Sequence, residues 1–342
     1  MALVYNVNSS ATQVLASKQI KENIFMDLVH RNGKGVNQVE ETNASTVRML
    51  KVSSIGGDAR ELGASAHGAF FNDTGVAIPE VPEYDLNLLY VFDKMADLPE
   101  VQQDMVPVDI FEQTMKNIGG RVATEINAST IAHQLASVYN LAKTAGKWDG
   151  RAIVLGSTPK YYEAIQDASA ILDDGDVDNG IQSFPFEDRE IIMKPSFRAK
   201  LMTTSGILLG GSNYAQSMIA KGGLSPDARK EFGNMYVGEI DLIPCYSAPS
   251  AIWNRAGEWL GSSTAFNGVQ AIVCAGSATD RGISTQDYVK VIDSPNGAGK
   301  RLQPKTRWGI NVCYPKGIVP ILTNGTAVPA SEVRVTAPGS KG

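Results

Sequence analysis

The side chains most suggestive of chemistry are three aspartates spaced two apart, Asp174, Asp176 and Asp178. They stand at positions one, three and five of a loop pattern that binds calcium through carboxylate oxygens. That pattern needs glycine at position six and glutamate at position twelve, where this chain has Asn179 and Pro185. The segment therefore predicts a polar surface turn rather than a calcium site.

A second candidate is the run Gly-Ala-Gly-Lys-Arg at 297–301, which matches part of a phosphate-binding loop. Such a loop needs a glycine five residues before its Gly-Lys pair and a serine or threonine directly after it. Here those places hold Ser294 and Arg301. The sequence argues against nucleotide binding and predicts a Gly- and Pro-rich turn with a basic tip, which could contact a neighbouring chain or a DNA phosphate.

The histidines and cysteines form no recognisable ligand set or catalytic pair. No histidine has a second histidine or a cysteine at metal-ligand spacing, and the sequence has no Gly-x-Ser-x-Gly nucleophile elbow. The odd number of widely spaced cysteines fits reduced thiols better than a disulfide framework. We therefore expect no catalytic residue, no cofactor and no metal ion. The residues concerned are His30, His67, His133, Cys245, Cys274 and Cys313.

The composition is that of a globular protein whose charges are unevenly spread. Of its 342 residues 43% are hydrophobic and 20% are charged, and the formal net charge of −5 argues against a dedicated nucleic-acid binder. Nine acids and one base lie between Glu80 and Glu112, whereas eight bases and three acids follow from Gln286 onward. These regions could complement each other within a subunit or between copies, or form two solvated faces. No secretory signal and no membrane span are expected.

One long predicted helix, from Pro107 to Ala145, dominates the elements that must position these side chains. Its apolar residues recur every three or four positions, which indicates one face of a helix. It would be roughly 55–60 Å long, whereas a globular chain of this length has a radius of gyration of about 20 Å. Such a helix would span the molecule, which suits an elongated tile better than a protein built around a pocket. The stripe comprises Phe111, Met115, Ile118, Val122, Ile126, Ile131, Leu135, Val138 and Ala142.

Before this helix, two strand patterns flank a long segment that has no apolar core of its own. The strands are predicted over Ser45–Ile55 and Tyr84–Phe92. About 28 residues rich in Gly, Ala, Ser, Asn and Asp separate them, which is long for a loop inside a compact domain. The segment is either disordered, an active-site lid or an arm that packs on another chain. Its position between two strands favours an extended hairpin arm.

After the long helix the pattern changes to mixed strands and helices. Strands are predicted over Arg151–Leu155, Ile191–Met193, Ile207–Leu209, Val237–Ile243 and Phe266–Cys274. Helices are predicted from Thr158 onward and over Ser225–Phe232. The chain then closes with a strand, a turn at Pro315–Gly317 and a short strand, all within Trp308–Ile321.

This order of elements resembles the major capsid protein of tailed phages, the Hong Kong 97-type fold that encapsulin shells also use. The matching residues span roughly 36–322 and include the link Asp97–Met105 and the closing run from Arg307 to Ile321, with its Trp-Gly strand, Pro-Lys turn and short apolar strand. The resemblance implies an α+β fold with an N-terminal arm, an extended β-hairpin arm (E-loop), a peripheral domain with the long spine helix, and an axial α/β domain. The implied boundaries are 1–35 for the N-terminal arm, 36–93 for the hairpin arm and its flanks, 94–147 for the peripheral domain, 148–285 for the axial domain, and 286–342 for the return to the peripheral domain and the C-terminal tail.

The same resemblance implies a structural protein without an active site. It would assemble as pentamers and hexamers into the icosahedral shell that encloses the double-stranded DNA genome of a phage. Implied partners are other copies of the chain, portal and scaffolding proteins, a decoration protein, and packaged DNA through weak non-specific contacts, but no membrane. The shell would assemble in the cytoplasm of the host bacterium and form part of the virion. The residues implied at subunit interfaces are Arg48, Lys51, Arg60, Glu61, His67, Phe70, Phe71, Tyr246 and Trp253.

Two other functions fit parts of the sequence. The first is an encapsulin-like compartment, which has the same fold and encloses protein cargo. The second is an α/β enzyme whose Gly-rich segment is a lid, but a lid should cover converging titratable groups. Between positions 56 and 80 the chain offers only Asp58, Arg60, Glu61, His67, Asp73 and Glu80.

Overall fold

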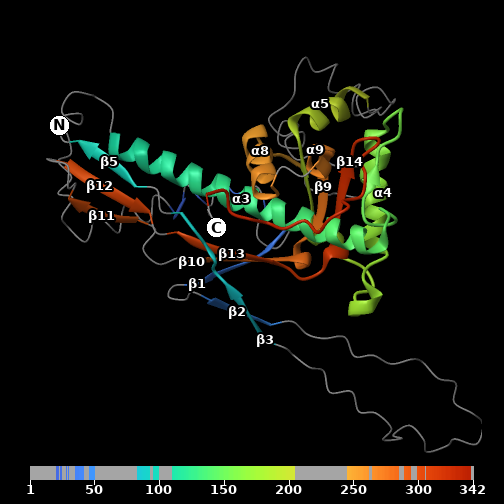
Figure 1. Cartoon of the computed structure of the whole chain (residues 1–342), viewed down its shortest axis with the longest axis horizontal. Coiled ribbons are helices and arrows are strands. Elements are labelled where there is room, and N and C mark those ends of the chain that lie inside the picture. The colour runs from blue at the N-terminus through green and yellow to red at the C-terminus, as the bar shows by residue number, and fades with distance from the viewer. Residues whose placement is uncertain are drawn as a thin grey trace, which may run out of the picture.

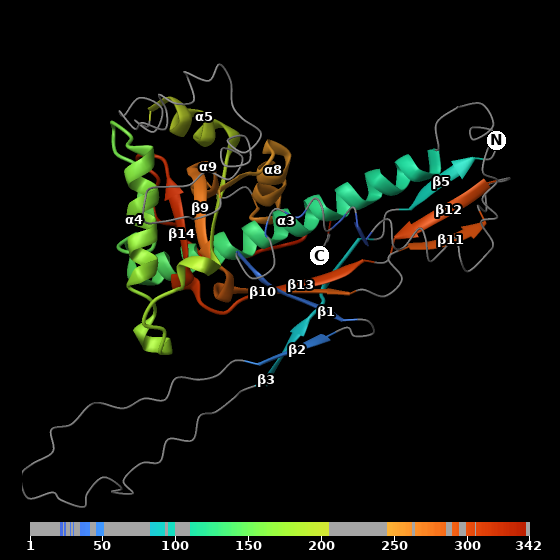
Figure 2. The same cartoon turned by 180° about the vertical axis from the view of Figure 1, so that it is seen from behind.

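One long helix, α3, organises the computed structural model, running from a small sheet at one end of the molecule to a larger sheet at the other (Figure 1). Figure 2 shows the same arrangement from behind. The structure describes residues 21–22, 24, 28, 30, 35–41, 46–50, 83–92, 95–99, 110–204, 245–261, 264–284, 289–293, 299–304 and 306–339.

Helix α3 spans Ile110–Ala145, 36 residues, and confirms the predicted spine helix. Gly119 and Gly120 lie inside it without interrupting it. Its middle is covered on more than one side, because polar residues such as Asn127 and Gln134 are also fully buried. The helix is therefore the centre of the core rather than a surface element. The apolar positions that the structure describes are all buried: Met115, Ile118, Val122, Ile126, Ile131, Leu135, Val138 and Ala142.

A five-stranded sheet lies at the C-terminal end of α3, with the strand order β6-β14-β9-β7-β8. Strand β9 pairs antiparallel with both β14 and β7, while the outer strands β6 and β8 run parallel to their neighbours. Figure 1 shows α4 beyond β14 and α8 beyond β9, so helices flank the sheet on both sides. The strands are β6 (Ile153–Val154), β7 (Arg189–Met193), β8 (Cys245–Ser247), β9 (Val269–Ala275) and β14 (Ile318–Leu322). The helices of this region are α4 (Tyr161–Asp173), α5 (Pro195–Thr204), α8 (Ser250–Trp259) and α9 (Thr264–Asn267).

A four-stranded sheet with the order β1-β10-β13-β4 brings strands from the N-terminal part of the chain beside strands from its C-terminal part. Strand β1 pairs parallel with β10, so a segment near the N-terminus lies beside one that follows about 240 residues later. Strand β13 pairs antiparallel with β10 and with β4. The strands are β1 (Asn37–Glu41), β4 (Tyr90–Val91), β10 (Thr279–Ser284) and β13 (Arg307–Val312).

A three-stranded sheet with the order β11-β12-β5 lies beside the N-terminal end of α3 (Figure 1). Its strands are β5 (Ala96–Pro99), β11 (Val289–Asp293) and β12 (Gly299–Pro304). The prediction of a turn over 297–301 is wrong for Gly299 to Arg301, which begin strand β12. Arg301 faces Asp97 across the β12–β5 ladder, and its Nε lies 2.5 Å from Asp97 Oδ1. At this place the basic C-terminal region and the acidic region complement each other within one subunit.

The predicted hairpin is confirmed at its base. Strand β2 (Thr46–Leu50) pairs antiparallel with β3 (Glu83–Asn87), from Thr46 opposite Asn87 to Leu50 opposite Glu83. The segment between Leu50 and Glu83 lies outside the described residues, as do the strands predicted over Ile207–Leu209 and Val237–Ile243 and the helix predicted over Ser225–Phe232.

The remaining predictions differ from the structure in detail. Helix α4 begins at Tyr161 rather than Thr158, and the run Phe266–Cys274 divides into the end of α9 and strand β9. The closing strand, turn and strand are confirmed as β13, a 3₁₀ turn at Pro315–Gly317 and β14. Among the described residues, no helix combines the length and the hydropathy that a bilayer span requires.

Candidate subunit-contact surfaces and a buried polar cluster

The base of the hairpin is seated directly on strand β13. A Cβ atom added at Gly309 would lie 2.2 Å from the backbone oxygen of Asn87, the last residue of β3. Only a residue without a side chain allows two backbones to approach this closely. Gly309 therefore fixes where the hairpin leaves the body. In the sequence, this glycine is marked by the Trp-Gly pair of the closing run.

Beyond the hairpin, Tyr90 on β4 anchors the chain to the spine helix. Its hydroxyl shares a 2.7 Å hydrogen bond with Nε2 of His133 on α3, and its ring packs edge-on against Trp259 at 4.8 Å between centroids. Burial raises the pKa of Tyr90 and lowers the pKa of His133 to about 4. His133 is therefore neutral near pH 7 and acts as a hydrogen-bonding group rather than as a charge.

Two tryptophan side chains extend this anchor along α3. Trp308 on β13 donates its Nε1 hydrogen to Ser129 Oγ at 2.9 Å, and Trp259 on α8 donates to Glu125 Oε2 at 3.1 Å. Arg255 donates to the other oxygen of Glu125 at 2.7 Å. The spine helix, α8 and the strands that follow the hairpin are thus joined by directional bonds as well as by apolar packing.

A short apolar surface lies just beyond the hairpin base. Leu89, Val91 and Met95 are 76%, 54% and 47% exposed, and Val91 belongs to β4, an edge strand of its sheet. Exposed large apolar side chains near one another in the sequence, on or beside a strand whose outer edge is unpaired among the described strands, are a candidate contact with another copy of the chain. Sequence reasoning missed this surface, because it only emerges once the strand edges are known.

The residues predicted at interfaces fall into three groups. Lys51, Arg60, Glu61, His67, Phe70 and Phe71 lie outside the described residues. Arg48 lies on β2, opposite Asp85 in the β2–β3 register, and Tyr246 on β8 is half-buried. Trp253 is only 1% exposed and belongs to the core of its own chain, so the expectation that it faces a neighbour is not supported.

Two of the three aspartates of the calcium-like pattern, Asp176 and Asp178, are held by a lysine. Lys316 Nζ lies 2.9 Å from Asp176 Oδ1 and 2.6 Å from Asp178 Oδ2. Asp176 is 2% exposed, so the expectation of a wholly surface turn is wrong for this residue. An ammonium group already occupies the position that a cation would take, and it ties this turn to the turn before β14.

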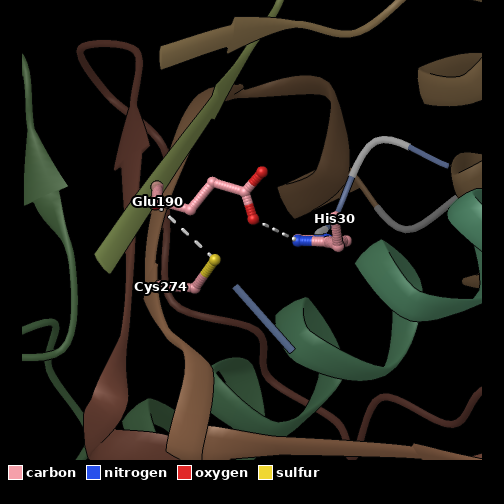
Figure 3. A group of neighbouring side chains, drawn as sticks. All are labelled: His30, Glu190 and Cys274. Atoms are coloured by element: carbon pink, nitrogen blue, oxygen red, sulfur yellow. Dashed lines mark hydrogen bonds and ion pairs between the residues drawn. The ribbon is translucent and has the colours of Figure 1, made fainter. Parts of the chain in front are cut away.

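A cluster of buried polar residues connects the N-terminal segment to both large sheets. Glu190 and Cys274 face each other across the β7–β9 ladder, and His30 Nδ1 lies 3.3 Å from Glu190 Oε2 (Figure 3). Arg281 on β10 donates through Nη2 to the backbone oxygen of His30 at 3.2 Å and to Gln38 Oε1 at 2.6 Å. The sequence could not reveal this cluster, because its members are up to 251 positions apart.

The neighbouring Arg189 shows what a fully satisfied buried arginine looks like in this fold. Side chains alternate between the two faces of a strand, so Arg189 points to the face opposite Glu190. It donates to Ser169 Oγ at 2.7 Å, to Asp173 Oδ1 at 2.5 Å and to the backbone oxygen of Phe184 at 2.6 Å. In the part of the chain that the structure describes, the cluster on the other face leaves three atoms unpaired: His30 Nε2, Glu190 Oε1 and Arg281 Nη1.

His30, Glu190 and Cys274 offer ligand atoms within 4.8 Å of one another, but their surroundings do not suit a metal ion. Burial raises the pKa of the Cys274 thiol well above its usual value, and the negative charge of Glu190 adds to this effect. The thiolate that binds metals is therefore disfavoured. Burial lowers the pKa of Arg281 to about 10, which still leaves it charged near neutral pH. A divalent ion beside this cation would leave a net positive charge in the core.

Comparison with known proteins finds similarity in structure alone. No model of a known protein family matches the sequence, and no curated protein matches it either. The head structure of Helicobacter pylori bacteriophage KHP40 matches with a TM-score of 0.52 and 10% identity, over 88% of this chain and 90% of that one. The capsid of Ralstonia phage GP4 matches with a TM-score of 0.51 and 10% identity, over 92% and 94%. The mature capsid of bacteriophage PhiM1 also gives a TM-score of 0.51 and 10% identity, over 87% and 88%.

Proposed function

Because the chain has the fold of phage capsid proteins, we propose that it is the major capsid protein of a tailed double-stranded DNA phage. It assembles as pentamers and hexamers into an icosahedral shell and has no catalytic role. The observation that carries the proposal is the match to three capsid or head structures over 87–92% of this chain.

The connections within the fold support the proposed division into peripheral and axial domains. Strand β5 follows the hairpin and pairs with β12 from the C-terminal part of the chain, at the N-terminal end of α3. This pairing joins 94–147 to 286–342, as a peripheral domain with a returning segment requires. The five-stranded sheet, with α4 and α8, forms the proposed axial domain at 148–285, apart from its strand β14.

We assign the contacts between subunits to the hairpin arm and its base. Arg48, Lys51 and Arg60 belong to this arm, and some of these bases face acids of an adjacent subunit in the proposed shell. Glu61, His67, Phe70 and Phe71 belong to the same arm, and Tyr246 contributes near a local symmetry axis. The exposed apolar surface of Leu89, Val91 and Met95 supports a contact at the foot of the arm.

The proposal includes partners beyond the chain itself. A closed phage head needs a portal, and its assembly uses a scaffolding protein, while a decoration protein can bind the outer face. Packaged DNA makes weak contacts with no sequence preference, which suits a chain whose net charge is −5. The shell assembles in the host bacterial cytoplasm and is part of the virion.

Electron microscopy of the purified full-length chain, together with light scattering, tests the proposal. Rings or closed shells of uniform size are expected, because an arm without a core of its own is ordered by its neighbours. A well-folded monomer at high protein concentration would contradict the proposal. An encapsulin-like compartment is the second candidate, and protein cargo rather than DNA inside shells from the native source would favour it.

A further inference from the structure

The N-terminal segment is held on the body through buried polar groups as well as through buried apolar side chains such as Ile24 and Val36. His30 is 1% exposed, and the backbone from Gly35 leads directly into strand β1 on the edge of the four-stranded sheet. A Cβ atom at Gly35 would lie 1.9 Å from Glu190 Oε2 and 2.6 Å from His30 Nδ1. The segment therefore passes in direct contact with the Glu190 carboxylate.

The charges in this cluster balance only while His30 is neutral. Among the residues that the structure describes, the titratable and charged groups that face His30 are Glu190 on β7, Cys274 on β9 and Arg281 on β10. One carboxylate and one guanidinium compensate each other, and the thiol is uncharged. When Glu190 accepts from Nδ1, the free lone pair of His30 is on Nε2, and a proton added there creates a second buried cation beside Arg281.

We propose that the His30–Glu190–Arg281 cluster is a proton-operated latch on the N-terminal segment, closed near neutral pH and opened by mild acid. Opening places His30 in water, where the second positive charge is solvated, and frees β1 from β10. The three unpaired buried atoms, His30 Nε2, Glu190 Oε1 and Arg281 Nη1, make the closed latch weaker than a fully bonded cluster such as that of Arg189.

The direction of the pH dependence follows from the histidine. Burial lowers the pKa of His30 below its ordinary value of 6.5. The released segment therefore binds a proton more readily than the latched one, and the latch loses stability as the pH falls below 6.5. Between about pH 7.5 and about pH 5.5, the ratio of released to latched segment should rise, and about tenfold is the largest rise that an ordinary histidine pKa of 6.5 allows.

Hydrogen–deuterium exchange on the purified full-length chain measures this ratio at β1 and β10. Comparing native and variant chains at the same pH cancels the intrinsic pH dependence of exchange. In the native chain, protection of Asn37–Glu41 should fall more on acidification than in His30→Gln, by up to about tenfold, because His30→Gln cannot take up the proton. His133→Gln is the comparison variant, because it removes a part-buried histidine outside the cluster. Its effect on global unfolding should reach β1 and β9 alike, so the acid response of β1 relative to β9 should stay as in the native chain.

A second variant tests the latch without relying on protonation. Gly35→Ala places a methyl group against the Glu190 carboxylate, so β1 should lose protection at both pH values while β9 keeps its own. The proposal is overturned if the native chain and His30→Gln respond equally to acid, or if Gly35→Ala leaves β1 fully protected. Added Zn²⁺ that restores protection in acid would overturn it too, because it would show a metal site instead.

Discussion

At the scale of single residues, polar groups in the core decide which elements are joined. His133, Tyr90, Trp308 and Ser129 form hydrogen bonds between α3 and the strands around the hairpin exit. Each bond contributes only about 0.5–1.5 kcal/mol net, but leaving a buried partner unpaired costs about 1–3 kcal/mol. These residues therefore fix the orientation of the strands on the helix more than they add to its stability.

The first prediction concerns the neutral state of His133. Its pKa of about 4 in the folded chain, against an ordinary 6.5, means that the unfolded chain takes up the proton first as the pH falls. The free energy of unfolding should decrease below pH 6.5, by up to about 3 kcal/mol from this residue near pH 4. Urea unfolding at several pH values should show a smaller decrease in His133→Gln. An equal decrease in both chains would contradict this.

The second prediction concerns the seat of the hairpin. In Gly309→Ala the new methyl group collides with the backbone of Asn87, which cannot move as a side-chain end would. We expect a loss of about 1–3 kcal/mol in the free energy of unfolding, measured by denaturant titration. Gly156→Ala is the matched control, since nothing lies within 4 Å of the added atom. A similar loss in both variants would show that Gly309 has no special role.

At the scale of elements, the sequence predicts those helices and strands whose formation depends on residues close to them in the sequence. The spine helix could be predicted because its apolar period is local and repeats over many turns. Strands β2, β7, β13 and β14 also carry clear apolar patterns. Strands β1, β5 and β12 do not, because short mixed strands are specified by partners far away in the sequence. The latch cluster could not be predicted either, since His30 and Glu190 are 160 positions apart.

The third prediction concerns the hairpin arm as an assembly element. Deleting Ala64–Asn72 should leave the body folded, because the buried core lies in the sheets and helices around α3. Closed shells should be abolished, as seen by electron microscopy, while circular dichroism stays near that of the native chain. Reversing a charge with Arg60→Glu should have a smaller effect that grows at low salt. Normal shells from the deletion variant, or an unfolded body, would refute the assignment.

At the scale of the whole molecule, charge limits how the chain meets nucleic acid. The chain is acidic overall, and the basic Arg301 is already paired with Asp97 of the same subunit. The fourth prediction is that free subunits bind DNA weakly, without sequence preference, and lose binding as salt rises. Filter binding with two unrelated duplexes over a salt series measures this. Binding of one sequence that survives high salt would contradict the proposed role.

The pairing of β1 with β10 also sets an order of events during synthesis. β1 cannot find its place until β10 has left the ribosome, and a contact over about 240 residues is slow to form. After β10 has been made and before β1 pairs with it, the sheet edge at β10 is open. The chain then exposes an unpaired strand that other chains could join. Strand β1, the earliest of the described strands in the chain, thus closes the edge of β10, which is made much later. The four-stranded sheet is therefore completed only after β10, Thr279–Ser284, has been made.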